Sequence, residues 1–362
     1  MIYQHSQIWT PEIISDIHVR ADGKYRISGF RPLHDLPSFD QLVFLASGLT
    51  RIPLEGYKER CETKTVLGCE SSQPLVIETP IYVHSTAGLS RNMRVELARG
   101  SSLADTALSI EGKLHPEEKK LAPRIISEIS TGKTSKISLS LGADAVQVNI
   151  DGQVRTEALQ ETLKEVRNRT ENRIPVFISL PAGAIDDDVE EVVRIGVDAV
   201  VLRGAPTISD NPRNLSNYCR IPMIAAIPMA RKALRRNKAL GKVNLIVASG
   251  IRNGADAAKA LALGADAVRI DESALIALGY YKTPNDLLEN GKTNAKNATR
   301  REWNPKRGSG IRIAKLINSM TMEIALLARS LGKGDVHSFE YEDLSALTLQ
   351  ASLMSGIKMA GK

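Results

Sequence analysis

A short hydrophobic motif recurs three times along the chain, as GADAVQV from Gly142, GVDAVVL from Gly196 and GADAVRI from Gly264. In each copy the glycine follows a stretch with the hydrophobic period of an amphipathic helix, and glycine can take the left-handed conformation that ends a helix. The apolar run after it is typical of a strand buried on both faces. The glycines are 54 and 68 residues apart, which we interpret as two and then three strand–helix units of roughly 22–30 residues each.

Other apolar runs predict further strands. Four of them lie between helical patterns, and a weaker one at 107–110 completes a count of eight with the three motifs. Strand–helix alternation over this length predicts a (β/α)8 barrel rather than an open doubly wound sheet. The four runs cover 79–84, 174–180, 221–227 and 244–249, and the helical patterns cover 91–104, 116–130, 157–169, 187–195, 229–240 and 254–263.

The segments that flank the barrel at 79–279 have a different pattern. Residues 1–78 combine short strand-like runs with Pro-rich turns and are expected to form an N-terminal cap segment. Residues 280–310 are rich in Lys, Asn and Gly and are expected to form a polar loop. Residues 311–362 are expected to form C-terminal helices that pack on the barrel. The two amphipathic stretches that predict these helices are 311–332 and 335–356.

The composition narrows the class of protein. Hydrophobic residues make up 43% of the chain and aromatic residues only 4%, so branched aliphatic residues and alanine must form the core. No apolar run approaches the roughly 20 residues of a membrane helix, and the first residues lack the apolar core of a signal peptide. We therefore expect a cytoplasmic protein with no membrane segment. The net charge of +7 is spread thinly, without interleaved aromatic residues, so nucleic-acid binding is not expected.

Reactive and metal-binding motifs are scarce. The three cysteines, Cys61, Cys69 and Cys219, form no CxxC group, which argues against structural zinc. Free thiols are favoured over a Cys61–Cys69 disulfide, since cytosolic thiols stay reduced. The sequence has no GxSxG elbow and no HExxH helix, so serine-hydrolase and metalloprotease chemistry are not expected, nor is a bound metal ion.

Four segments carry a resemblance to a known family. LPSFDQLVFLASGLTRIPLEGYKERCETKTVLG (36–68) and SGIRNGADAAKALALGADAV (249–268) are the most specific, and 79–106 and 320–361 extend the likeness over nearly the whole chain. They resemble the FMN-binding synthase domain of the glutamate synthase large subunit, in its archaeal and N-methylglutamate-synthase types. The resemblance implies an FMN barrel that reduces 2-iminoglutarate to glutamate, an oxidoreductase reaction on CH–NH2 donors.

The same resemblance implies partners and cofactors. In the family, ammonia comes from a glutaminase unit and electrons come through an iron–sulfur cluster. A glutaminase unit is not expected in this chain, and separate glutamate synthase-type subunits are expected to supply both ammonia and electrons. The cluster cysteines would fall within 280–310, where the chain has none. Because cluster ligation requires thiolates, we expect no iron–sulfur cluster.

The resemblance also places flavin contacts on particular residues. Gly88 and Ser90 fall in the loop after the first strand, Gly204 after the predicted fifth strand, and Ser249 and Gly250 after the seventh. Glycines at such positions let backbone N–H groups approach a phosphate closely. The loops after strands 7 and 8 are the usual phosphate site of this fold.

Two acidic residues stand where the family has Gly-Thr after the eighth strand. Asp271 and Glu272 would lie about 5 Å from the flavin phosphate, which at an effective dielectric constant of ~20 costs several kcal/mol. In the alternative interpretation both side chains turn outward and cap a helix that begins at Ser273. Either way the close backbone approach of glycine is lost.

Other positions change the expected chemistry as well. Ser179, on the predicted fourth strand, replaces a family lysine that faces flavin and substrate, and serine cannot stabilise negative charge as an ammonium does. His84, at the end of the first predicted strand, is interpreted either as a polar site residue or as packing at the barrel mouth. No residue is therefore assigned with assurance to catalysis.

These observations favour a catalytically degenerate paralogue, which takes part in glutamate and nitrogen metabolism as a structural or regulatory partner of synthase subunits or as a homo-oligomer. The alternative is an active FMN-dependent, glutamate synthase-like oxidoreductase supplied with ammonia and electrons by separate subunits. A third possibility is a barrel that binds a different, less anionic small molecule at its mouth.

Overall fold

The computed structural model describes residues 17–18, 21–23, 36–46, 52–55, 60–130, 142–150, 156–204, 221–280 and 305–362. The chain divides into two compact units, 1–36 and 37–362. The helices and strands described below all belong to the second unit. The predicted strand-like run at 24–30 and most of the predicted polar loop lie outside the described residues.

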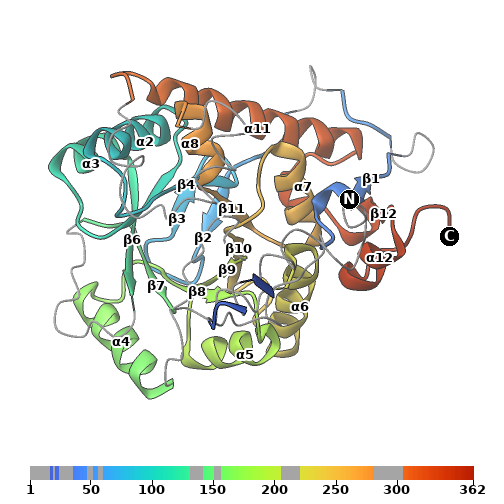
Figure 1. The fold of residues 1–362 in the computed structure, drawn as a ribbon, viewed down its shortest axis with the longest axis horizontal. Coiled ribbons are helices and arrows are strands. Elements are labelled where there is room, and N and C mark those ends of the chain that lie inside the picture. Colours follow the sequence, from blue (N-terminus) through green and yellow to red (C-terminus); the bar gives the residue numbers. More distant parts are fainter. Residues whose placement is uncertain are drawn as a thin grey trace. The chain divides into compact units, whose positions relative to one another are not determined.

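Eight parallel strands close into a barrel, which confirms the predicted fold (Figure 1). Neighbouring strands follow the order β10-β11-β4-β5-β6-β7-β8-β9, so each strand pairs with the next along the chain and the last pairs with the first. The strands are β4 (Ile81–Ser85), β5 (Ala107–Glu111), β6 (Arg124–Ser130), β7 (Ala145–Asn149), β8 (Val176–Pro181), β9 (Ala199–Arg203), β10 (Asn244–Val247) and β11 (Ala267–Ile270).

Helices follow the strands and surround the barrel in Figure 1. They end as the glycine motif predicts: Gly196 and Gly264 are C-caps with φ of +87° and +113°, in the left-handed region that favours glycine. The third motif glycine, Gly142, also has a positive φ, of +85°. The helices are α2 (Arg91–Leu103), α3 (Pro116–Leu121), α4 (Thr156–Arg169), α5 (Ile185–Ile195), α6 (Met223–Arg236), α7 (Gly254–Leu263) and α8 (Glu272–Leu278).

Two elements of the barrel differ from the prediction. The pattern at 116–130 predicted one helix, but α3 ends at Leu121 and strand β6 begins at Arg124. Pro123 lies between them and explains the break, because proline lacks the N–H that an α-helix needs and disfavours helix in the residue before it. The run 221–227 predicted a strand, but α6 begins there, and its first five residues are all buried. A short apolar run without a face period is compatible with either structure.

The strand missed at 124–130 and the strand wrongly predicted at 221–227 leave the total at eight. They change the position of each intervening strand in the barrel order. Counted from β4, Ser179 lies on the fifth barrel strand rather than the fourth, and Gly204 follows the sixth rather than the fifth. The span between Gly196 and Gly264 holds two strand–helix units, not three.

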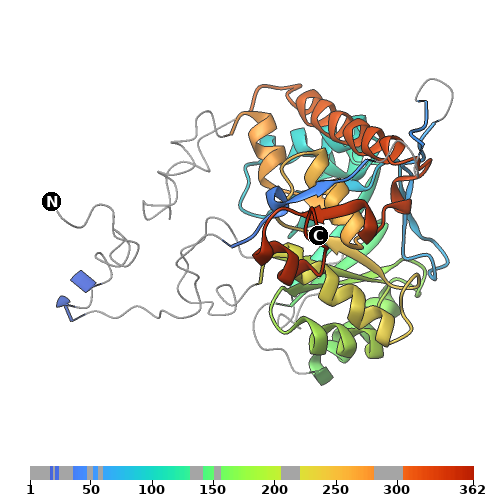
Figure 2. The same ribbon diagram turned by 90° about the vertical axis from the view of Figure 1, so that its right-hand side faces the viewer.

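A long helix and several short elements pack around the barrel. Helix α11 (Gly310–Ser330) lies along α2, α7 and α8 and crosses the top of both Figure 1 and Figure 2. Of the described helices, none combines the length and apolar character needed to cross a membrane. The single helix predicted at 335–356 is wrong. It is replaced by η3 (Val336–Ser338), η4 (Tyr341–Asp343), β12 (Leu344–Ala346) and α12 (Leu349–Ser355).

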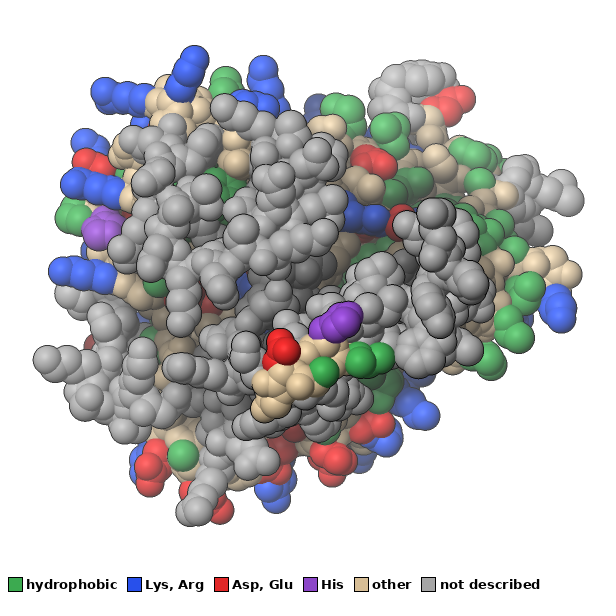
Figure 3. All heavy atoms as spheres, in the orientation of Figure 1, with side chains coloured by type: hydrophobic (Ala, Val, Ile, Leu, Met, Phe, Trp, Pro, Cys, Tyr) green, Lys and Arg blue, Asp and Glu red, His purple; other side chains and the backbone are tan. Residues whose placement is uncertain are grey.

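Two small antiparallel sheets complete the fold. Strand β12 pairs with β1 (Leu42–Phe44), which follows η1 (Phe39–Gln41). Strand β2 (Thr65–Leu67) pairs with β3 (Leu75–Ile77), and the apolar side chains of this pair join the hydrophobic cluster of the barrel interior. On the face shown in Figure 3, basic and acidic side chains are interspersed along the edges of the described part, which agrees with a thinly spread net charge.

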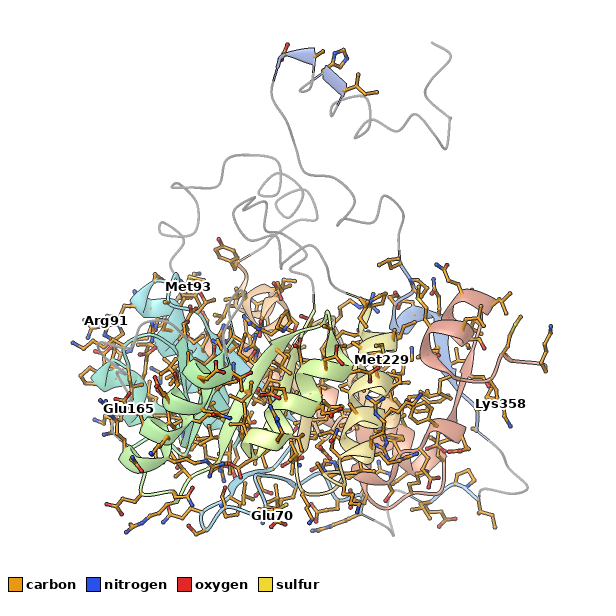
Figure 4. All side chains as sticks on the ribbon, turned by 90° about the horizontal axis from the view of Figure 1, so that it is seen from below. Glu70, Arg91, Met93, Glu165, Met229 and Lys358 are labelled. Atoms are coloured by element: carbon orange, nitrogen blue, oxygen red, sulfur yellow. The ribbon has the colours of Figure 1, made fainter. Side chains whose placement is uncertain are left out.

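The small β2–β3 sheet closes the end of the barrel where the strands begin. In Figure 4, Glu70 between these strands lies at the lower edge, whereas Arg91 and Met93, at the start of α2, lie towards the upper edge. Helix α2 follows the C-terminal end of β4. Functional side chains of such barrels gather at that C-terminal end.

Candidate functional site

The barrel interior changes from apolar to polar towards its C-terminal end. Residues two apart on a strand share a face, and alternate strands contribute four side chains to each layer. The two lower layers are apolar and belong to one buried cluster, whereas the next two layers are mostly polar. From the lower end upward, the layers are Ala107, Ala145, Ala199 and Ala267; Tyr82, Ile126, Phe177 and Ile246; Ser109, Gln147, Val201 and Arg269; and His84, Glu128, Ser179 and Ala248.

Glu128 is the centre of the polar layers. Its Oε1 lies 2.9 Å from His84 Nδ1 and 3.3 Å from Arg269 Nη1, and it also accepts a hydrogen bond from the Ser109 hydroxyl. Its Oε2 accepts a hydrogen bond of 2.8 Å from Asn149 Nδ2. Four side chains from four other strands therefore converge on one buried carboxylate.

Arg269 connects this carboxylate to the end of β11. Its Nη2 lies 3.1 Å from Asp271 Oδ2, so the guanidinium is shared by two carboxylates. The four side chains His84, Glu128, Arg269 and Asp271 form a row of alternating charge across the upper lumen, which we call the lumen ion chain. Their side chains are 10%, 2%, 6% and 24% exposed, respectively, so the chain is nearly enclosed.

The electrostatics favour the charged forms of His84, Glu128 and Arg269. Burial opposes charge on His84, but the Glu128 carboxylate outweighs it and raises the pKa of His84 above 6.5. Burial would raise the pKa of Glu128, but His84, Arg269 and the Ser109 hydroxyl hold it well below the usual range. Burial also disfavours charge on Arg269, yet Asp271 and Glu128 keep its pKa above the usual value. Compensation of this kind is what lets charges persist in a protein interior.

The structure shows the directions of the Asp271 and Glu272 side chains, which follow β11. Asp271 is the N-cap residue of α8 but makes no side-chain capping bond, because its carboxylate turns to Arg269 instead. Glu272 is exposed and is the first residue of α8, one position earlier than predicted. The outward-capping interpretation is therefore wrong for Asp271.

In the loop after β4, the predicted flavin contacts Gly88 and Ser90 make hydrogen bonds within the protein. Ser90 caps α2, and its hydroxyl accepts a 3.4 Å hydrogen bond from Met93 N. Gly88 N donates to Thr86 Oγ1 at 3.1 Å. The neighbouring Ala87 N donates to Glu111 Oε2 at 3.3 Å, so two adjacent backbone donors of this loop already have partners.

The loops after β9 and β10 bring three predicted residues together. Gly204 N donates to Ser249 Oγ at 3.0 Å, and a Cβ at Gly204 would lie 2.8 Å from Ser249 Cβ. Gly250 has a φ of +80°, so this turn needs glycine. The serine side chain thus fills the space in front of Gly204.

Ser179 lies in the layer that contains His84 and Glu128. It is fully buried, and its Oγ has no hydrogen-bond partner among the described residues. Three other buried atoms of the lumen likewise have no hydrogen-bond partner among the described residues. They are Gln147 Oε1, Arg269 Nε and Asp271 Oδ1. Such atoms are commonly satisfied by ordered water.

Sequence reasoning found His84, Ser179, Asp271 and Glu272 but missed Glu128 and Arg269. Glu128 was missed because its segment was interpreted as helix. Arg269 lies in the third copy of the recurring strand motif. The other two copies have Gln147 and Val201 at the same position, so the motif was interpreted as an ordinary buried strand. A charged residue on a strand buried on both faces was the available signal, since such residues are rarely buried without a partner.

The described cysteines lie apart from the mouth of the barrel. Cys61 and Cys69 are free thiols, which confirms that interpretation, and Cys219 lies outside the described residues. Cys61 Sγ contacts the carbonyl of Lys333, whereas Cys69 Sγ contacts the carbonyl of Gly241. Within the described part of the chain, no group of three or more His, Cys, Asp or Glu residues is placed to hold a metal ion.

Solved structures share this barrel. A mutant flavocytochrome b2 with benzoylformate matches with a TM-score of 0.59 and 18% identity, over 87% of this chain and 78% of that one. A mandelate oxidase mutant with a monooxide FMN adduct matches with a TM-score of 0.57 and 17% identity, over 85% of this chain and 88% of that one. At this level of identity the likeness supports the fold alone.

Sequence comparisons point to one family. Residues 147–334, over half of the chain, match the family model described as a conserved region in glutamate synthase. A glutamate synthase large subunit-like protein of Rhizobium meliloti (strain 1021) is 30% identical, over 94% of this chain and 91% of its own length. An archaeal-type glutamate synthase (NADPH) of Dehalococcoides mccartyi is 24% identical, over 99% of this chain and 86% of its own length. The chain therefore belongs to the glutamate synthase family.

Proposed function

We propose that this chain is a glutamate synthase-related barrel that does not hold FMN, and that it serves glutamate and nitrogen metabolism as a structural or regulatory partner of catalytic synthase subunits. The lumen ion chain is the observation that carries the proposal. It places four paired charges, three of them almost fully buried, across the upper lumen, where the family resemblance puts the flavin.

The residues present do not fit a flavin on three counts. A ring entering the lumen would have to separate Arg269 from Glu128 or Asp271, and breaking a buried ion pair is strongly destabilising. The N–H groups of Ala87 and Gly88, in the loop after β4, already donate to Glu111 on β5 and to Thr86. At the phosphate end, Asp271 and Glu272 stand where the family has Gly-Thr, so the close backbone approach that glycine offers to a phosphate is lost.

Electron supply supports the same proposal. The whole chain has three cysteines, and none lies within 280–310. Because iron–sulfur clusters are held by thiolates, we infer that this chain carries no cluster. The described Cys61 and Cys69 bond to carbonyls in separate parts of the fold, which leaves them unsuited to ligate one cluster together.

A second candidate function is an active FMN-dependent, glutamate synthase-like oxidoreductase that receives ammonia and electrons from separate subunits. One observation favours it. The turn after β10 keeps Gly250 in the left-handed conformation with a φ of +80°, at the loop where barrels of this class bind phosphate. A third candidate, a barrel that takes a less anionic small molecule, is favoured by the unpartnered polar atoms of Ser179 and Gln147 in the lumen.

Flavin content separates these candidates. We expect the purified chain to be colourless, and to return to colourless when it is incubated with excess FMN and desalted. Stoichiometric yellow protein in either preparation would contradict the proposal and support the active enzyme.

A double variant with Asp271→Gly and Glu272→Thr tests which feature excludes the flavin. We expect at most partial FMN binding, because the His84–Glu128 pair and the committed loop donors remain. Binding as tight as that of a flavin-containing synthase would show that the two acids alone exclude the cofactor. The partner role is tested separately, by whether the chain co-elutes with glutamate synthase-type subunits and changes their rate of glutamate formation.

A further inference from the structure

We propose that the lumen ion chain is a proton-controlled lock, in which protonated His84 keeps Arg269 available to Asp271 and so holds the start of α8 against the barrel. Loss of the proton would release Asp271 and loosen α8. This inference rests on the proposed function in one respect, because it requires a lumen filled by side chains rather than by flavin.

The geometry joins three strands and the following helix in one series. His84 on β4 lies 2.9 Å from Glu128 on β6, Glu128 lies 3.3 Å from Arg269 on β11, and Arg269 lies 3.1 Å from Asp271. Asp271 is the N-cap residue of α8, and its backbone oxygen accepts a 3.2 Å hydrogen bond from Leu275 N in the first helical turn. A shift of Asp271 therefore acts directly on the beginning of this seven-residue helix.

The charge balance makes the series sensitive to one proton. With His84 protonated the four groups sum to zero charge, and with His84 neutral they carry one net negative charge in a nearly enclosed space. Among these four groups, Arg269 is then the single cation beside two carboxylates. Since attraction between charges is strong at short range in a protein interior, we expect Arg269 to move towards Glu128, the more buried carboxylate, and away from Asp271.

Other groups around His84 do not replace it. Tyr82, on its own strand, is fully buried, and burial raises its pKa so that it stays neutral. From β5, Ser109 faces Glu128 and carries no charge. Three charged groups on β11 and at the start of α8 interact electrostatically with His84. They are Arg269, Asp271 and Glu272. Histidine is the side chain whose ordinary pKa lies nearest neutral pH.

The direction of the pH effect follows from the raised pKa of His84. A histidine whose pKa is higher in the folded than in the unfolded protein contributes stability that is fully present below about pH 6.5 and is lost as pH rises through the folded pKa. Glu128 has the opposite sign, because its pKa is lowered. Its contribution is present above about pH 4.5 and is lost as pH falls through its folded pKa.

Amide hydrogen exchange of α8 measures the lock directly. In the colourless wild-type protein, we expect exchange in α8, corrected for the intrinsic effect of pH, to stay constant around pH 6 and to accelerate by about tenfold as pH rises through the pKa of His84. His84→Gln, which is neutral at every pH, should show the fast rate throughout. Asp271→Asn weakens the last link without touching the buried core, and it should also show the fast rate at all pH values.

A matched control separates this effect from general alkaline loosening. His18, an exposed residue of the first compact unit, offers His18→Gln, which should keep the wild-type pH profile of α8. A colourless protein whose α8 exchange is independent of pH and equal in wild type and Asp271→Asn would overturn the lock alone. A flavin-containing, yellow wild type would overturn the proposed function and the lock together.

Discussion

At the residue scale, Arg269 explains how two acids can stand at the end of β11. Its guanidinium binds Asp271 and Glu128 together, so Asp271 faces a cation instead of solvent or a ligand phosphate. In the sequence, Asp271 stands where a phosphate site would be expected. In the structure its carboxylate is paired with Arg269, two positions earlier in the chain. The pairing also removes Asp271 from its usual capping role at α8.

Glu128→Gln tests the centre of the lumen ion chain. The variant keeps the size of the side chain but leaves His84 without its anionic partner and Arg269 with only Asp271. We expect the free energy of unfolding to fall by about 3–5 kcal/mol, the usual cost of removing one partner from a buried ion pair. Urea denaturation followed by circular dichroism measures the change.

Glu117→Gln is the matched control for this substitution. Glu117 pairs with Arg91 at 3.0 Å, but both side chains are more than half exposed, and Arg91 lies at the outer edge of the molecule in Figure 4. Exposed ion pairs add little stability, so this variant should unfold like wild type. Equal stability of the Glu128 and Glu117 variants would show that the lumen pairs contribute no more than a surface pair.

At the element scale, the close crossing of α2 and α11 depends on two glycines. A Cβ at Gly100 would lie 2.6 Å from Ile313 Cβ, and a Cβ at Gly310 would lie 2.6 Å from the carbonyl oxygen of Glu96. Glu96 also accepts hydrogen bonds from Gly308 N and Gly310 N at the start of α11. Backbone contact of this kind requires residues without a side chain.

Gly100→Ala should therefore destabilise the protein. We expect a loss of about 1–3 kcal/mol from overpacking, even though alanine favours a helix by about 0.5–1 kcal/mol over glycine. Chemical denaturation gives the measurement, with Gly334→Ala as the control. A Cβ at Gly334 meets only Leu54 Cδ1, at an ordinary 3.9 Å. If Gly100→Ala were as stable as the control, the helices would have room to separate.

At the scale of the whole molecule, the barrel is closed and filled by its own side chains. Apolar layers occupy the lower lumen, the β2–β3 sheet adds to them, and the lumen ion chain spans the upper end. If this lumen holds no FMN, as proposed above, the stability of the barrel is independent of flavin.

Thermal unfolding with added FMN tests this independence. A ligand that binds only the folded state at 100 times its Kd stabilises it by about 2.7 kcal/mol, so a bound flavin would raise Tm clearly. We expect the Tm of this chain to be unchanged by excess FMN, with a flavin-binding barrel of the same fold as the positive control. A rise of several degrees would mean that the lumen opens to admit the cofactor.

Particular elements show how far the sequence could be followed. The motif glycines predicted helix ends at Gly196 and Gly264 correctly, because a left-handed C-cap is a local requirement that one residue type meets. Strand β6 was missed although Pro123 marked the end of the helix before it. Two of its side chains point into the lumen, the apolar Ile126 and the charged Glu128. Their polarity matches the residues across the lumen, and it gives the strand no regular apolar–polar alternation that the sequence could reveal.

The sequence alone determined the barrel, its glycine-capped helices and the family, since periodicity, turn residues and family motifs are written along the chain. Only the tertiary structure decided how the mouth is organised. His84, Glu128 and Arg269 are separated by up to 185 positions in the chain, and no local pattern states that their charges meet. Closure of the barrel brings the ends of β4, β6 and β11 together, and in that enclosed space each charge is stable only because the others are there.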